Sequence, residues 1–302
     1  KSKPKMPKIS VIIPCYNQGQ YIDETVDSVL AQTYQDFEII IVNDGSTDEF
    51  TINKLKNFTK PKTSVIHTGN QGVASARNTG IRASNGQYIL PLDGDDKIHP
   101  DFLSEACAIL DNNDNIGIVY SQGEMFGDQA GLCKLPEFPL EQILKQNCIF
   151  CTALFRKNDY DKTRGYDPQM FSLEDWDLWL SLIESGAGVY QIPRVLFYYR
   201  ITNKSKLRSR NADQIRHLNQ QIFLNHTNLY ANHFHDPINL YYENQSQARY
   251  IKYLRDRILL IQNSMMYKTG ELLIRPFRYI KHMIKPNTHP KDFKTISKYN
   301  QQ

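Results

Sequence analysis

Over its first 200 residues, the chain alternates short apolar runs rich in β-branched residues with segments of helical spacing. Four such runs occupy residues 8–14, 37–42, 63–68 and 87–92. Runs of roughly four to eight residues between turn signals are typical of buried strands, and strands that alternate with helices form largely parallel sheets. The sequence therefore predicts an α/β fold with a mixed, mostly parallel sheet flanked by helices.

Further strand patterns and one helical pattern follow before residue 205, and then the character of the chain changes. The strand patterns lie at 116–121, 151–156, 188–193 and 195–200, and the helical one at 172–185. From Asn211 onward, helical patterns replace strand patterns. We therefore place a boundary near residue 205, between a domain at 1–205 and a mainly helical C-terminal region at 206–302.

The formal net charge of +4 conceals an uneven distribution. Residues 1–200 carry 19 basic and 26 acidic side chains, whereas residues 201–302 carry 17 and 6. This asymmetry favours an acidic catalytic or cation-binding body joined to a basic segment that faces phospholipid or a polyanionic substrate.

The five cysteines are few for 302 residues and odd in number, which favours a reducing compartment, so we expect a cytoplasmic protein.

Three aspartates, Asp93, Asp95 and Asp96, directly follow the apolar run at 87–92. Ligands of open α/β sheets collect beyond the carboxyl ends of the strands. Carboxylates this close raise one another's pKa unless a cation neutralises them, and their oxygens suit Mg²⁺ or Mn²⁺. The alternative is a solvated acidic turn that caps a helix beginning near Pro100.

The order of further motifs favours a functional interpretation of the acidic cluster. The segments VIIPCYN, IIIVNDGSTD, NQGVASARNTGI, LPLDGDD, and GYD followed by LEDWDLW together resemble the family 2 glycosyltransferases. These are inverting enzymes with the GT-A fold, and the resemblance covers about residues 8–205. It implies a nucleotide-sugar half at about 8–96 and an acceptor half at about 97–205.

The resemblance also implies contacts to the donor nucleotide. It places Asp44 on the base, typically uracil, whose ring N–H suits an acceptor-only carboxylate. The other matching positions near the nucleoside, ribose or diphosphate are Pro14, Tyr16, Asn17, Arg77, Asn78 and Asp93. The alternatives are that Tyr16 is a packing residue and that Arg77 is a surface charge on a helix of small residues.

Asp93 and Asp95 match the DxD pair of the family, which contacts the ribose and chelates the metal ion, here Mn²⁺ or Mg²⁺. We predict Asp95 and Asp96 as the metal ligands and leave open which of them touches the ion. Thr202 departs from the pattern, because many family members carry a histidine two residues after the arginine of FYYR, where it helps to bind the metal or the diphosphate. Basic alternatives for the diphosphate are Lys204, Lys206 and Arg208.

Glu174 and Asp175 match the ED motif of the family, whose aspartate acts as the general base. An inverting transfer needs a group that takes the proton of the attacking hydroxyl, and a carboxylate within hydrogen-bond reach does so. The alternative for both residues is a helix N-terminus stabilised by negative charge. Trp176 and Trp179 in the same segment are candidates either for an acceptor groove or for the core.

These features predict a metal-dependent inverting glycosyltransferase, of the hexosyl or N-acetylhexosaminyl type. It moves a sugar from a nucleotide donor, a UDP-sugar, to a hydroxyl of a cell-surface glycan, free or lipid-linked. We expect no nucleic-acid partner. The alternative is a catalytically silent protein that keeps the fold to bind glycan or nucleotide, or to tether an assembly at the membrane. Retention of Asp95 and Asp175 argues against it, whereas Thr202 leaves it open.

A nucleotidyltransferase is a further alternative, but the chain lacks a glycine-rich, lysine-bearing phosphate loop near its first strand.

The basic C-terminal region suggests one more partner, an anionic membrane surface at the inner face of the cell membrane. Residues 270–285 alternate apolar side chains with arginine and lysine, although Pro276 interrupts the pattern. The alternative is an ordinary amphipathic helix packed on the core.

Overall fold

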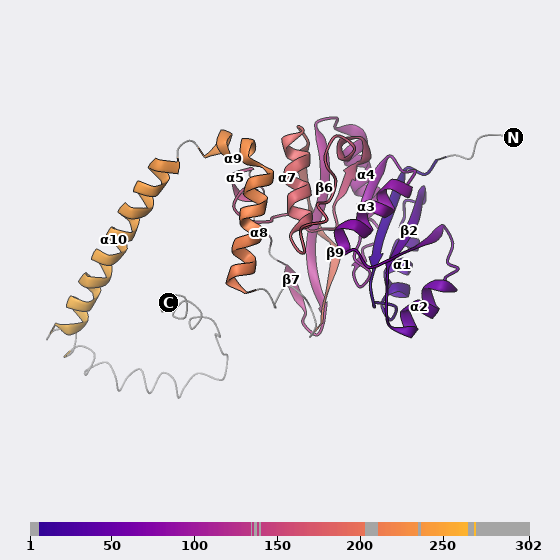
Figure 1. The fold of residues 1–302 in the computed structure, drawn as a ribbon, viewed down its shortest axis with the longest axis horizontal. Coiled ribbons are helices and arrows are strands. Elements are labelled where there is room, and N and C mark those ends of the chain that lie inside the picture. Colours follow the sequence, from indigo (N-terminus) through magenta and orange to yellow (C-terminus); the bar gives the residue numbers. More distant parts are fainter. Residues whose placement is uncertain are drawn as a thin grey trace. The chain divides into compact units, whose positions relative to one another are not determined.

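The computed structural model describes residues 6–133, 135, 138, 140–202, 211–234, 237–264 and 269. The chain divides into two compact units, residues 1–233 and residues 234–302. The first unit contains a single mixed sheet with helices packed against it (Figure 1).

Nine strands form this sheet within the described residues. They are β1 (Ile9–Cys15), β2 (Phe37–Asp44), β3 (Thr63–Thr68), β4 (Tyr88–Pro91), β5 (Lys97–Ile98), β6 (Ile116–Gly127), β7 (Gly131–Cys133), β8 (Leu154–Arg156) and β9 (Gly188–Ile201). Their order is β3-β2-β1-β4-β8-β6-β9-β5, and β7 pairs with β6. The pairings β3–β2, β2–β1, β1–β4 and β6–β9 are parallel and include most of the paired residues, whereas β8 runs antiparallel to β4 and β6. The predicted mixed, mostly parallel sheet is confirmed.

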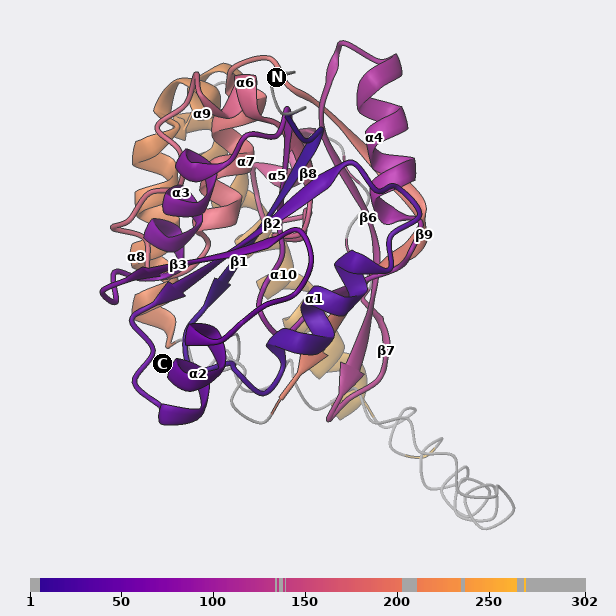
Figure 2. The ribbon, with the colours of Figure 1, turned by 90° about the vertical axis from the view of Figure 1, so that its right-hand side faces the viewer.

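Helices connect the strands. They are α1 (Ile22–Leu30), α2 (Glu49–Lys56), α3 (Val73–Ala83), α4 (Phe102–Asn112), α5 (Leu140–Ile143), α6 (Lys157–Tyr160), α7 (Glu174–Glu184), α8 (Ala212–Asn225), α9 (Thr227–His233) and α10 (Pro237–Asn263). Because side chains alternate along a strand, Val11 and Ile13 of β1 join the core under α1 and α4, on one face of the sheet. The other face carries α3 (Figure 2), where a Cβ on Gly80 would lie 2.4 Å from the Ile12 side chain. Glycine therefore lets α3 pack closely on β1.

Helices α8 and α9 belong to the first unit, although the sequence prediction assigned them to the C-terminal region. Their buried residues include Leu218, Ile222 and Leu229. The Tyr230 hydroxyl also donates a hydrogen bond of 2.9 Å to the backbone oxygen of Leu144. The structural boundary lies after His233, later than the predicted one near 205, because these contacts fasten both helices to the domain that carries the sheet.

His226, between α8 and α9, is buried against two carboxylates of α7. Its Nε2 atom lies 3.0 Å from Asp177 Oδ1, and its Nδ1 atom lies 3.1 Å from Glu184 Oε2. Burial alone would lower the pKa of His226, but the hydrogen bonds to the two carboxylates outweigh it and raise the pKa above its ordinary value of 6.5. The imidazolium therefore holds α8 and α9 on α7.

We expect His226→Gln to lower the free energy of unfolding by about 1–3 kcal/mol at pH 6. Because the folded-state pKa is raised, the stability from this group is fully present below the unfolded pKa of 6.5 and is lost as the pH rises through the folded value. Urea unfolding of both proteins at pH 6 and at pH 8.5 measures the difference. A deficit of the same size at both pH values would contradict the charged pairing.

The second unit contributes α10, a helix of 27 residues. Among the helices that the structure describes, none has the length and apolarity that a membrane crossing requires. Residues 270–285, on which the membrane prediction rests, lie outside the described residues.

Candidate active site

The site begins where β1 and β2 end side by side, because parallel strands direct their carboxyl ends to the same edge. Asn17, with a left-handed φ of 55°, accepts hydrogen bonds at Oδ1 from the backbone N–H groups of Thr47 (2.7 Å) and Asp48 (3.1 Å). Asn17 therefore ties the loop after β2 to the end of β1. Pro14 is buried within β1, whereas Tyr16 is 39% exposed, so Tyr16 is not a core packing residue.

Asp44, the last residue of β2, is buried and holds the loop that leads into α3. Its Oδ1 and Oδ2 atoms accept hydrogen bonds of 2.9 Å from the backbone N–H groups of Gln71 and Gly72, respectively. The turn after it needs glycine, because Gly45 has a φ of 66° and a Cβ there would lie 2.4 Å from the backbone nitrogen of Asn70. Each oxygen of Asp44 retains capacity for a second hydrogen bond.

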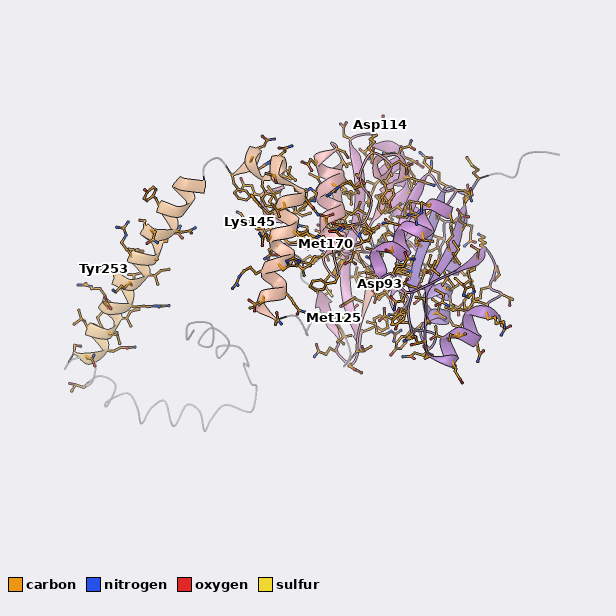
Figure 3. The ribbon with its side chains drawn as sticks, in the orientation of Figure 1. Asp93, Asp114, Met125, Lys145, Met170 and Tyr253 are labelled. Carbon is orange, nitrogen blue, oxygen red and sulfur yellow. The ribbon has the colours of Figure 1, made fainter. Side chains whose placement is uncertain are left out.

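Arg77 of α3 links two motifs that lie far apart in the sequence. Its Nη2 atom donates to Asp93 Oδ1 and its Nη1 atom to Glu174 Oε1, each at 2.6 Å. Burial disfavours its charge, but the two carboxylates hold the pKa of Arg77 well above its ordinary value. With a side chain only 2% exposed, Arg77 is not the surface charge of the alternative interpretation. The acidic loop, marked by Asp93 in Figure 3, and the ED pair are thereby brought together.

Asn78, the next residue of α3, is occupied by protein contacts. Its Oδ1 atom accepts from the Tyr160 hydroxyl (2.6 Å) and from the N–H of Tyr166 (3.0 Å), and its Nδ2 atom donates to the Tyr166 carbonyl (2.7 Å). Two hydrogen bonds saturate the amide oxygen. Asn78 therefore positions the loop after α6, and its place near the nucleotide stays a prediction.

Asp96 and Asp95 occupy the loop between β4 and β5. Asp96 is 1% exposed; its Oδ1 atom accepts 2.8 Å from the N–H of Arg200, and its Oδ2 atom is buried with no hydrogen-bond partner among the described residues. Burial, followed by the charges of Asp95 and Asp93, raises the pKa of Asp96 above its ordinary value. Burial and Asp93 raise the pKa of the half-buried Asp95 to about 6. The cluster thus keeps buried carboxylates close together, and a bound cation would offset the repulsion between their charges.

Arg200, near the end of β9, supports this acidic loop. Its Nε atom donates a hydrogen bond of 2.7 Å to the backbone oxygen of Asp95, and its guanidinium forms an ion pair with Glu24 of α1. The guanidinium carbon lies 4.6 Å from the Tyr21 ring centroid and 4.2 Å from that of Phe126. Sequence reasoning used this arginine only as a landmark and missed its contact with the loop.

The acidic loop suits a divalent cation that is also bound by a ligand, because the protein alone supplies few metal ligands. Across the described ranges, no three His, Cys, Asp or Glu side chains are arranged to hold a metal ion. Asp96 nevertheless has an orphaned buried oxygen, and Asp95 lies half-buried beside it. Mg²⁺ is commonly bound by one or two carboxylates together with substrate phosphates. The donor set therefore suits a cation shared with a phosphate-bearing ligand, and Thr202 adds no histidine to it.

Asp175 lies in the first turn of α7, next to the ion-paired Glu174. Its Oδ2 atom accepts 3.1 Å from Asn147 Nδ2, and its Oδ1 atom accepts 2.8 Å from the N–H of Trp176. Burial, followed by the charge of Glu174, raises the pKa of Asp175 to about 7. A carboxylate with this pKa can take up a proton near neutral pH. Sequence reasoning missed Asn147, because nothing in its surrounding segment marks it.

The start of α7 is set by strain and by packing. Leu173, directly before the ED pair, has a left-handed φ of 63°, which costs on the order of 1–3 kcal/mol. Trp176 is buried and donates 2.7 Å from Nε1 to the backbone oxygen of Ile143, and Trp179 is fully buried. Both tryptophans therefore belong to the core, not to an acceptor groove, and they fix α7 behind Asp175.

A sheet of this topology, with an acidic loop after β4 and an ED pair opposite it, defines a glycosyltransferase of the GT-A class. The family model described as Glycosyl transferase family 2 matches residues 10–164. The chain belongs to glycosyl transferase family 2, and the resemblance seen in its motifs is confirmed.

The curated relatives include long synthases and shorter proteins. The chain is 29% identical to a chondroitin synthase and 31% identical to a hyaluronan synthase, both of Pasteurella multocida, over 69% and 60% of its length. It spans only 22% and 19%, respectively, of those two proteins. An uncharacterized glycosyltransferase of Nostoc sp. is 31% identical over 75% of either chain.

The fold also matches solved structures. Staphylococcus aureus TarS 1–349, in complex with UDP-GlcNAc, gives a TM-score of 0.59 at 20% identity and covers 75% of this chain and 73% of that one. At this identity the likeness concerns the fold, and the predicted GT-A architecture is confirmed.

Proposed function

We propose that this glycosyltransferase is an inverting, metal-dependent enzyme that moves a sugar from a UDP-sugar to a hydroxyl of a cell-surface glycan. The observation that carries the proposal is the Arg77 bridge, which holds the acidic loop and the ED pair in one site. Relatives named chondroitin and hyaluronan synthases and the TarS complex with UDP-GlcNAc support the substrate classes.

In this proposal, the uridine lies at the ends of β1 and β2. Asp44 accepts the ring N–H of uracil through its remaining lone pairs, and the exposed Tyr16 flanks the base. Asn17 keeps the two loops together beneath it. Because Arg77 is only 2% exposed and is ion-paired with Asp93 and Glu174, the proposal gives it the role of orienting Asp93.

Asp95 and Asp96 would hold Mn²⁺ or Mg²⁺ together with the donor diphosphate. When bound, the ion would neutralise charge that develops on the departing diphosphate. Arg200 keeps both aspartates in place through the Asp95 carbonyl and the Asp96 carboxylate, so the loop is already formed before any ligand arrives.

Asp175 is the general base of the proposal. It takes the proton of the acceptor hydroxyl, which attacks the sugar on the face opposite the leaving diphosphate. Glu174 is held by Arg77 and contributes differently: its charge raises the pKa of Asp175 toward neutrality. The donation from Asn147 orients the carboxylate.

The proposed metal role predicts how UDP binds. We expect UDP to stabilise the fold with Mn²⁺, by about 2.7 kcal/mol at a hundredfold excess over Kd, and much less without it. Asp95→Asn and Asp96→Asn each lower the metal-supported affinity by at least about tenfold, and the true ligand shows the larger loss. Titration calorimetry with and without Mn²⁺ measures both effects. Equal UDP affinity with and without metal would contradict chelation, and a preference for GDP would contradict the role of Asp44.

We further propose that the acceptor glycan is lipid-linked, so that the enzyme works at an anionic membrane surface. The excess of 17 basic over 6 acidic residues beyond residue 200 supports this partner. The predicted cytoplasmic location stays a prediction.

A further inference from the structure

Helix α10 carries a concentration of exposed apolar side chains. Of the large apolar residues that the structure leaves exposed, nine of nineteen lie on this one helix. Five of them, Tyr250, Ile251, Leu254, Ile258 and Ile261, are between 41% and 61% exposed. A soluble surface rarely gathers so much apolar area without a binding partner.

These five residues share one side of the helix. At 3.6 residues per turn, positions 250, 251, 254, 258 and 261 lie within roughly a quarter to a third of the helix circumference. We call them the α10 apolar face. Leu259 points to the opposite side, although it is as exposed as its neighbour Ile258, at 55% against 52%.

Basic residues border this face. By the same helical repeat, Arg257 lies along one edge, with the exposed Tyr253 and Leu260 beyond it, and Arg255 lies along the other edge. The acidic Asp256 lies on the side away from the face. An apolar stripe between cationic borders, with tyrosine among its residues, complements the acyl and headgroup layers of an anionic bilayer.

A second copy of the chain is the competing occupant, because Ile251, Leu254, Ile258 and Ile261 follow the 3-4-3 spacing of a coiled-coil seam. That spacing covers only about two heptads, whereas stable coiled coils sustain it over three or four. The basic borders are also better matched by anionic lipid than by the same borders of a second copy. Charge complementarity therefore favours the membrane.

We propose that the α10 apolar face docks on anionic phospholipid, and this inference rests on the proposed lipid-linked acceptor. The segment that makes the contact is Tyr250–Ile261 of the described helix. It lies upstream of residues 270–285, on which the sequence prediction relied, and needs no contribution from them.

Co-sedimentation of the full chain with vesicles tests the inference, using phosphatidylcholine alone or mixed with phosphatidylglycerol. We expect binding only to the mixed vesicles, weakened by high salt. Ile258→Asp lowers the partition constant by at least about tenfold, because it places a charge on the apolar face. Leu259→Asp is the matched control: it introduces the same charge at an adjacent, equally exposed position and leaves most of the binding intact.

Other results would overturn the inference. Equal losses in the two variants, or equal binding to both vesicle types, would show that the α10 apolar face is not the contact. Absence of vesicle binding, combined with a dimer that Ile258→Asp dissociates in sedimentation velocity, would assign the face to a second copy. UDP binding with Mn²⁺, measured for the wild-type protein and for Ile258→Asp, separates the two proposals. If neither protein binds UDP, the donor site is contradicted and the vesicle result still stands.

Discussion

Replacing Asp175 with asparagine should lower glycosyl transfer by roughly 10²-fold or more while UDP binding persists. Asparagine keeps the shape of the side chain and can still pair with Asn147, but it cannot accept a proton from the acceptor hydroxyl. Steady-state UDP release, together with calorimetric UDP binding, separates the two effects. Full activity in this variant would transfer the role of base to Glu174 or to another group.

The same carboxylate predicts how the rate depends on pH. Because the pKa of Asp175 is about 7 and the base acts when ionised, the rate should fall as the pH drops below 7, approaching tenfold per pH unit. In Asp175→Asn this acidic limb should disappear from the residual activity. Retention of an identical limb in the variant would show that another group titrates.

Replacing Arg77 with methionine should lower the free energy of unfolding by about 3–5 kcal/mol. The substitution leaves Asp93 and Glu174 without their buried cation, and the desolvation of both carboxylates is then uncompensated. Urea unfolding measures the loss. Arg82→Met is the matched control, because Arg82 belongs to the same helix but is exposed, and we expect its effect to stay within about 0.5 kcal/mol. Equal effects of the two substitutions would contradict the role of Arg77 as a buried bridge between Asp93 and Glu174.

Much of the site could be predicted from the sequence, because its residues follow strands that can be recognised in the sequence as apolar runs. Asp44 ends β2, and Asp95 follows β4, so parallel pairing to β1 was enough to expect both at one edge of the sheet. The strand and helix alternation likewise predicted the mixed sheet. In each case a local pattern determines which element forms, and the topology of parallel strands then brings the elements together.

Other features depend on contacts that no local pattern encodes. The sequence predicted Arg77 near the nucleotide, with a surface charge as the alternative, but its burial between Asp93 and Glu174 depends on contacts with segments far along the chain. Arg200 meets the acidic loop across about a hundred residues of chain. The structure groups α8 and α9 with the unit that carries the sheet, through contacts such as that of Tyr230 with Leu144, which their helical patterns do not show.

The release of UDP from a panel of UDP-sugars, measured with and without Mn²⁺, tests the central claim most directly. We predict that at least one UDP-sugar yields UDP in a reaction that needs Mn²⁺ and that GDP-sugars do not replace it. Asp175→Asn should lower this release by roughly 10²-fold or more while still binding UDP. If the wild-type protein binds UDP but releases it from no UDP-sugar, with a glycan acceptor supplied and Mn²⁺ present, the chain is a silent binding protein and the catalytic account is contradicted.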